Sequence, residues 1–318
     1  MDLSHLPEAV LVNMLRQASP TTVITAKRLN KKMHRIVERN HLAKPRVDEF
    51  NVEVRTFFSR TRPIGKLQLK NGGAVQRRLV VTMKRRNKSR QVVEEGVEGP
   101  SSLSGTHVIG EEMKKVLLCD RLSFDGITAD TAFFSMLTAK WNDLRCIHNL
   151  SFTLCRLKFT EEQLLSLLAR TSCRSLTLDF CHFEQDIITD KVIASMPQLR
   201  TLRVQPRSSV FHRHLTDTSV RNWGSSPPHT IALYNCSTSI TLQGIFDMIK
   251  AVDVDTAVDW DFGRVLPSEG ADGQLFSMLS IPGLTILVSD DFRSRRVQMT
   301  RGTSRIAFNL TKEEAYTS

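Results

Sequence analysis

Residues 176–181 read Leu-Thr-Leu-Asp-Phe-Cys, and variants of this pattern recur through the second half of the chain. Each copy places two apolar residues on either side of one variable position, which is typical of a strand with one buried face. Successive copies start 28, 26, 26, 29, 27 and 26 residues apart. The copies begin at Leu122, Leu150, Leu176, Leu202, Ile231, Val258 and Leu284. Such even spacing indicates one structural unit used repeatedly.

Helical patterns lie between these copies. Thr160 and Gln163 have the spacing of a capping box, and leucines follow them at helical spacing. A strand plus a helix every 26 to 29 residues is the period of leucine-rich repeats, in which each unit buries its apolar face against its neighbours. The sequence therefore predicts an irregular leucine-rich-repeat-like strand and helix solenoid over residues 111–318. An ordinary α/β domain with evenly spaced strands is the alternative.

The segment before the repeats is rich in β-type patterns. Leu79, Val81 and Met83 alternate with more polar positions, which predicts a half-buried strand. A second short strand is predicted at residues 67–69, with a glycine turn at residues 71–73 between the two. We expect a small antiparallel sheet here, followed by a long surface loop over residues 86–110.

Positive charge is concentrated in this same segment. The chain has a net charge of +11, and the stretch from Val54 to Val93 holds twelve Lys and Arg with no Asp or Glu. The segment is interpreted as a nuclear-import signal, a dock for an acidic partner or a solvated charged loop. No aromatic residue lies between Phe58 and Phe124, which argues against base stacking on nucleic acid. The predicted basic patch consists of Arg77, Arg78, Lys84, Arg85, Arg86, Lys88 and Arg90.

The first forty residues have the pattern of three short helices. Residues 6–15 read Leu-Pro-Glu-Ala-Val-Leu-Val-Asn-Met-Leu, with apolar residues four apart after the proline. Ser19 precedes Pro20 as an N-cap, and Asn30 is placed to cap a third helix. Three helices of this size cannot bury all their apolar surface against each other. Part of that surface is therefore expected to pack on the rest of the chain or on a partner.

Residues 2–42 resemble an F-box of the divergent, nematode-type families. The resemblance is carried by Leu6-Pro7, by the apolar run 10–15, by Ser19-Pro20 and by the segment Ala-Lys-Arg-Leu-Asn at residues 26–30. It implies binding to a Skp-type adaptor within a cullin-based ubiquitin ligase, and presentation of a protein substrate for ubiquitination. The expected adaptor contacts are Leu6, Pro7, Val10, Leu11, Met14, Leu15, Ile24 and Leu29.

The substrate surface implied by this resemblance is the open strand face of the repeats. Residues that alternate with the apolar core positions of a strand point away from the core. The expected substrate contacts are Ser151, Thr153, Thr177, Asp179, Arg203 and Gln205. A compact domain associated with nematode-type F-boxes is the alternative architecture for this region.

Together these patterns predict an α+β fold. It consists of an N-terminal three-helix F-box at residues 1–45, a basic strand and loop region with a small antiparallel sheet at residues 46–110, and an irregular leucine-rich-repeat-like solenoid at residues 111–318. No apolar run reaches the ~18 residues of a membrane span, and the first residues lack the pattern of a secretion signal. We expect an intracellular protein, cytoplasmic and/or nuclear, with no membrane contact and with its six cysteines as buried thiols.

Motifs for bond chemistry are missing from the sequence. There is no phosphate-binding glycine loop, zinc-protease helix or nucleophile elbow. His182 lies beside Cys181, with His212 and His214 downstream, but the spacing matches no zinc pattern. A run of alternating carboxylates is typical of an exposed sheet face: Asp253, Asp255, Asp259 and Asp261. The sequence predicts neither an enzyme, nor a cofactor, nor a metal site. The alternative function is a basic nucleic-acid-binding or nuclear scaffold protein acting through residues 77–90.

Overall fold

The structure is a computed structural model that describes residues 6–40, 42–58, 75–95, 103–140, 144, 146–252, 256–266, 271–290 and 294–311. The chain divides into two units. Unit 1 comprises residues 1–127 and 132–147, and unit 2 comprises residues 128–131 and 148–318.

The elements of unit 1 are α1 (Glu8–Gln17), α2 (Pro20–Leu29), α3 (Lys31–Arg39), β1 (Arg46–Phe58), β2 (Val75–Arg85), β3 (Lys88–Glu95), α4 (Leu103–Lys114), β4 (Leu117–Asp125) and, except for its first residue, α5 (Thr131–Lys140). The elements of unit 2 are β5 (Thr128–Ala129), β6 (Asn149–Thr153), β7 (Arg156–Leu157), α6 (Glu161–Leu168), β8 (Ser175–Phe183), α7 (Asp190–Ala194), β9 (Thr201–Pro206), β10 (Val210–Thr216), α8 (Asp217–Ser225), β11 (Thr230–Leu233), β12 (Cys236–Thr241), α9 (Leu242–Ala251), β13 (Asp259–Leu266), α10 (Ala271–Met278), β14 (Leu284–Asp290), β15 (Ser294–Arg301) and β16 (Ser304–Thr311).

The predicted fold class, an α+β chain with an F-box, a small antiparallel sheet and a leucine-rich-repeat-like solenoid, is wrong. The described residues form an α/β arrangement of sixteen strands and ten helices. Eight strands of unit 2 follow the order β6-β8-β9-β11-β13-β16-β15-β14. Neighbouring strands pair in parallel from β6 to β16. Strand β15 pairs antiparallel with both β16 and β14, so it alone of these eight strands runs in the opposite direction. A large mixed sheet, mostly parallel, therefore replaces the expected solenoid.

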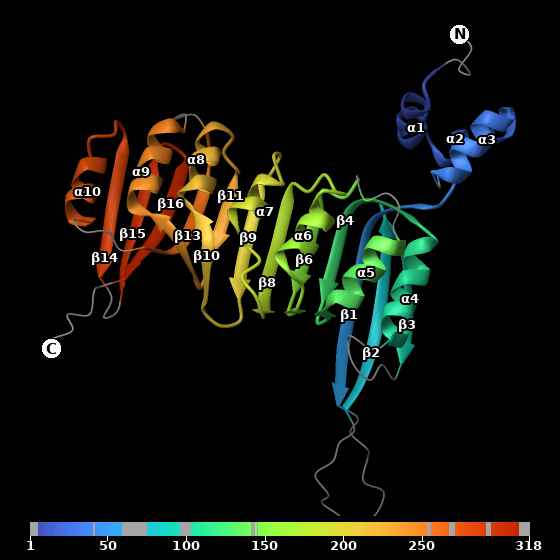
Figure 1. The fold of residues 1–318 in the computed structure, drawn as a ribbon, viewed down its shortest axis with the longest axis horizontal. Helices are drawn as coiled ribbons and strands as arrows, with labels where there is room; N and C mark the ends of the chain where they lie inside the picture. The colour runs from blue at the N-terminus through green and yellow to red at the C-terminus, as the bar shows by residue number, and fades with distance from the viewer. Residues whose placement is uncertain are drawn as a thin grey trace, which may run out of the picture. The chain divides into compact units, whose positions relative to one another are not determined.

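Helices join the parallel strands of unit 2, and α6, α7, α8 and α9 lie along one face of its sheet (Figure 1). A parallel pair requires a crossover connection, and a helix is the usual form of that connection. The even strand spacing in the sequence thus indicated parallel strands with helical crossovers. It did not indicate that the parallel pairing stops at β16.

The strands of unit 2 are aligned so that apolar residues stand beside apolar residues. Leu176 pairs with Leu150 on one side and with Leu202 on the other, and two positions further along each strand the same pairing recurs. Ile231 continues this row beside Leu202, and all of these side chains are buried. The predicted copies at these four strands are therefore confirmed in their register.

The last two predicted copies are not placed as expected. We aligned Val258 with Ile231, whereas the structure pairs Ile231 with Trp260, a shift of two residues. The copy at Leu284 belongs to β14, which pairs antiparallel with β15, and it is Ile306 of β16 that stands beside Trp260. A local alternation does not define register when a neighbouring position of the same parity is also apolar.

The sheet of unit 1 is larger than the small antiparallel sheet that we predicted. Strands β1, β2 and β3 pair antiparallel, and β1 also pairs in parallel with β4, from Arg46 beside Leu117 to Glu53 beside Asp125. Leu79 to Met83 are buried at every position, so β2 is covered on both faces instead of one.

The loop predicted at residues 86–110 is also wrong where the structure describes it. Lys88–Glu95 form the edge strand β3, and Leu103–Lys114 form α4. Charged residues suit an edge strand because its outer backbone faces water, so high polarity did not mean a loop here. The strand and turn predicted at residues 67–73 lie outside the described residues.

Helices α1, α2 and α3 share a core of their own. The Ser19 hydroxyl accepts the Thr22 amide at 3.1 Å and the Asn30 side chain accepts the Met33 amide at 2.8 Å, so both predicted caps are formed. The buried residues of this core are Leu11, Val12, Leu15, Val23, Ala26, Met33, Ile36, Val37 and Leu42.

Carboxylates link the N-terminal ends of the successive helices α6, α7, α8 and α9 of unit 2. One acidic residue in the first turn of each of the first three helices accepts a hydrogen bond from the N-cap threonine of the next helix. Asp190 accepts the Thr216 amide at 3.0 Å and its hydroxyl at 2.5 Å, and also the Ser219 hydroxyl at 2.6 Å. The acceptor and donor pairs are Glu161 with Thr189, Asp190 with Thr216, and Asp217 with Thr241. These bonds tie the start of each helix to the previous crossover.

Replacing Asp190 by Ala should lower the free energy of unfolding by about 2–4 kcal/mol, because three donors lose one charged acceptor. Urea unfolding followed by circular dichroism measures the change. The control is Asp247→Ala, since Asp247 accepts one bond from Gln243 at an exposed position of α9. An equal effect of the two substitutions would contradict the role assigned to the linking carboxylates.

Candidate protein-interaction surfaces

Apolar side chains are exposed on α1 and α2. Val10 and Met14 are one helical turn apart and both are exposed, Met14 to 48%. On α2 the side chains of Ile24 and Leu29 are exposed as well, Leu29 to 63%. These four side chains lie outside the buried core of the three helices, and exposed apolar side chains of this kind make a candidate interface.

The expected adaptor contacts divide into two groups. Pro7, Val10, Met14, Ile24 and Leu29 are exposed, and Leu6 is half-buried. Leu11 and Leu15 are buried inside the three-helix core, where they hold α1 against its neighbours. The exposed group is named the apolar stripe below, and Leu11 and Leu15 support it from beneath.

An open groove with basic walls runs beside α2 and α3. Ile24 lies at its edge, and Lys27 and Glu38 form an ion pair across the two helices. The other charged or titratable residues that line it are Arg28, Lys31, His34, Arg35 and Arg39. A partner that covers the apolar stripe and extends into this groove would need acidic side chains.

The structure brings together the six residues predicted for substrate contact. Ser151, Thr177 and Arg203 stand side by side in one row across β6, β8 and β9. The next row, two residues along each strand, is Thr153, Asp179 and Gln205. All six side chains are half-buried, in contrast to the fully buried residues that alternate with them. They form one polar face, which we call the open face.

Arg203 contacts both a carboxylate and an aromatic ring. Its Nε donates to Asp179 Oδ1 at 2.7 Å, and its guanidinium carbon lies 5.9 Å from the centre of the Tyr234 ring. Such a cation–π contact and ion pair together hold a long side chain in one conformation. Arg203 therefore links the predicted rows to the strands that follow.

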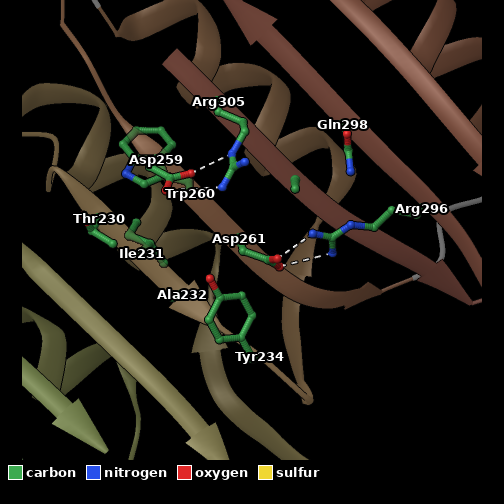
Figure 2. A pocket seen from close by; sticks show the side chains of 11 residues that line it. Thr230, Ile231, Ala232, Tyr234, Asp259, Trp260, Asp261, Arg296, Gln298 and Arg305 are labelled. Atoms are coloured by element: carbon green, nitrogen blue, oxygen red, sulfur yellow. Dashed lines mark hydrogen bonds and ion pairs between the residues drawn. The ribbon is translucent and has the colours of Figure 1, made fainter. Parts of the chain in front are cut away.

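A cavity of about 210 Å³ opens on the same face, further along the sheet (Figure 2). At its centre stands Asp261, between Ala232 of β11 and Ala307 of β16 in the strand register. Two alanines beside one longer residue leave the hollow, since both neighbouring positions lack side-chain bulk. The remaining polar residues of its lining are Thr230, Tyr234, Asp259, Arg296, Gln298 and Arg305.

Two arginine–aspartate pairs line this cavity. Arg296 donates to both oxygens of Asp261, at 3.3 and 2.5 Å, and Arg305 donates to Asp259 at 2.9 Å (Figure 2). The side chains of the first pair are 29% and 14% exposed, and those of the second pair 65% and 58%. The pair of Arg296 with Asp261 is thus largely shielded from solvent, while the pair of Arg305 with Asp259 is accessible to a ligand.

Sequence reasoning noted Asp259 and Asp261 as an exposed sheet face but missed the arginines that pair with them. Arg296 and Arg305 come from the last two strands, 35 and 46 residues away. Arginine alternates with apolar residues near the C-terminus, which indicates strands with arginine on one face. Only the strand order shows that this face lies beside Asp259 and Asp261. Asp253 and Asp255 lie outside the described residues.

At least three of the seven residues of the basic patch form ion pairs with carboxylates from other elements of unit 1. Ion pairs join Arg78 to Glu95, Lys84 to Glu49 and Arg90 to Glu112. The backbone amide of Arg86 also donates to Asp48 at 2.8 Å. Lys88 and Arg85 are exposed. This pairing reduces the charge available to a phosphate backbone, which a local count of basic residues could not reveal.

The residues weighed as zinc ligands do not gather. Cys181 is buried and its thiol lies 3.3 Å from the Phe152 carbonyl, while His182 is exposed. His212 is buried and its Nδ1 lies 2.8 Å from Asp186. Over the described ranges no group of three or more His, Cys, Asp or Glu side chains could hold a metal ion.

Four of the six cysteines are buried and all six are free; Cys119 and Cys146 are half-buried. Burial raises the pKa of the Cys173 and Cys236 thiols to about 12 and that of Cys119 to about 11. These thiols remain protonated at neutral pH and act as small apolar side chains, because the thiolate is the nucleophilic form.

Comparison with known proteins adds no identity. No family model matches the chain, and a search of curated proteins finds no similar sequence. Within the part of the chain that the structure describes, no helix is both long and apolar enough to cross a bilayer. The resemblance to an F-box therefore rests on the residues themselves.

The two arginines of the cavity should differ sharply in their effect on stability. Arg296→Ala leaves the partly buried Asp261 carboxylate without its charged donor, and we expect a loss of about 1–3 kcal/mol in the free energy of unfolding. Arg305→Ala breaks an exposed pair and should change it by less than about 0.5 kcal/mol. Urea unfolding of both variants measures the two losses. A loss for Arg296→Ala no larger than that for Arg305→Ala would contradict the difference assigned to the two pairs.

Proposed function

We propose that this chain is a substrate-recognition adaptor of a Skp–cullin–F-box ubiquitin ligase. The observation that carries the proposal is the apolar stripe: Val10 and Met14 are exposed on α1, while Leu11, Val12 and Leu15 of the same helix are buried in the three-helix core. A short helix whose apolar residues at i and i+4 remain outside its own core presents the pattern by which amphipathic helices bind a partner.

In this proposal the apolar stripe binds the Skp-type adaptor. The buried anchors of the interface are Pro7, which precedes α1, Val10 and Met14 on α1, and Ile24 and Leu29 on α2. The basic groove beside α2 and α3 favours an adaptor surface with acidic side chains next to its apolar contact. Leu11 and Leu15 keep α1 in place and act indirectly.

The open face of unit 2 binds the protein substrate in the same proposal. Its half-buried Ser, Thr, Asp and Arg side chains offer hydrogen-bond donors and acceptors at the regular spacing of adjacent strands. The chain performs no bond chemistry itself. It raises the effective concentration of substrate at the ligase and orients it, while other subunits transfer ubiquitin. This role places the protein inside the cell, in the cytoplasm and/or the nucleus.

Capture by an immobilised recombinant Skp-type adaptor tests the proposal. The double variant Val10→Asp/Met14→Asp should lose at least about tenfold in capture, because both charges would enter an apolar interface. Its circular dichroism spectrum and unfolding midpoint should remain those of the unmodified chain, since both positions are exposed.

The matched control is Asn13→Asp, which adds a charge to an exposed position of the same helix outside the apolar stripe. It should be captured as well as the unmodified chain. If the unmodified chain is not captured by the adaptor, or if the double variant binds equally well, the proposed function is incorrect.

A further inference from the structure

In the part of unit 2 that the structure describes, strand β14 is the last strand of the sheet and has one unpaired edge. Among the described residues it pairs only with β15, and its sequence from Leu284 to Asp290 reads Leu-Thr-Ile-Leu-Val-Ser-Asp. Leu287 and Val288, on opposite faces of this strand, are 64% and 48% exposed. An exposed edge strand with apolar side chains is a template for pairing with another strand.

The other terminal strand of the described fold, β3 in unit 1, shows what a protected edge looks like. Its sequence is Lys-Ser-Arg-Gln-Val-Val-Glu-Glu, so charged residues stand at both ends and near its middle. Charged side chains on an edge strand oppose pairing with a second chain. Strand β14 has no Lys, Arg or Pro, and its one charged residue, Asp290, stands at its end.

The sequence of β14 is complementary to itself in the antiparallel direction. With Leu287 opposite Leu287 of a second strand, Ile286 stands opposite Val288 and Thr285 opposite Ser289. Apolar residues therefore meet apolar residues, hydroxyls meet hydroxyls, and no charges of like sign meet near the centre. A two-fold axis through Leu287 generates this register, as an isologous dimer requires.

We propose that β14 pairs antiparallel with β14 of a second copy of this chain, centred on Leu287. Helix α10, which ends six residues before β14 begins, adds apolar surface to the same end of the unit. Phe276 on this helix and Leu279, directly after it, are exposed. The two-fold axis would use this surface twice and join two sheets of unit 2 through backbone hydrogen bonds. The proposal is independent of the adaptor function.

Disulfide trapping tests the register. In Leu287→Cys the two introduced thiols face each other, with Cα atoms about 4.5–5.5 Å apart, within reach of a disulfide. Oxidation should produce a covalent dimer on non-reducing gels. Thr285→Cys is the control, because the two copies of residue 285 would be about 13 Å apart along the strands. A dimer band of equal strength in the control, or no band in Leu287→Cys above the unmodified chain, overturns the proposed pairing.

Molar mass in solution provides an independent test. Light scattering over roughly 1–100 µM should show a mass that rises toward twice 36.0 kDa for the unmodified chain. Val288→Lys should remain monomeric over the same range while keeping the circular dichroism spectrum of the unmodified chain. Val93→Lys changes an equally exposed valine, 50% against 48%, on the charged edge strand β3 and should dimerise normally. A monomeric mass for the unmodified chain throughout, or a loss of dimer in both variants, contradicts the proposal.

Discussion

The alignment of apolar residues between neighbouring parallel strands is the constraint on which unit 2 depends. Leu176 stands between Leu150 and Leu202, and the residues on either side of each leucine must then point to the opposite face. A slip of one residue in any strand would place a polar row in the core and an apolar row in water. Burial thus determines which side chains are available for recognition.

The interaction surfaces follow from this constraint together with a few local departures from it. Arg203 and Asp179 lie on the open face because they alternate with buried residues, and the cavity forms where Ala232 and Ala307 replace longer side chains in the same row. The carboxylates that link successive helices fix the crossovers on the other face. At the N-terminus the candidate surface is apolar instead of polar, because Val10 and Met14 lie outside the three-helix core.

Local patterns in the sequence predicted much of this arrangement and failed where distant segments decide the outcome. The strands at Leu150, Leu176 and Leu202 were found because alternation and even spacing are local properties. The pairing of Trp260 with Ile231, the reversal of direction at β15 and the carboxylates that pair with Arg78 and Arg90 depend on segments far away in the chain. Polarity misled the prediction at β3, since edge strands and loops are both rich in charge. Leu11 is buried and its neighbour Val10 is exposed, and this difference depends on how the three helices pack, which the sequence pattern alone does not define.

Two adjacent residues test the central claim most directly. Leu176→Asn and Thr177→Asn introduce the same side chain at neighbouring positions of β8, one directed into the core and one onto the open face. The account predicts that Leu176→Asn lowers the free energy of unfolding by at least about 3 kcal/mol, because a leucine cavity and an unpaired amide are created together. Thr177→Asn should change it by less than about 1 kcal/mol. Equal losses, or a larger loss at Thr177, measured by urea unfolding, would contradict the strand register from which the rest of unit 2 has been derived.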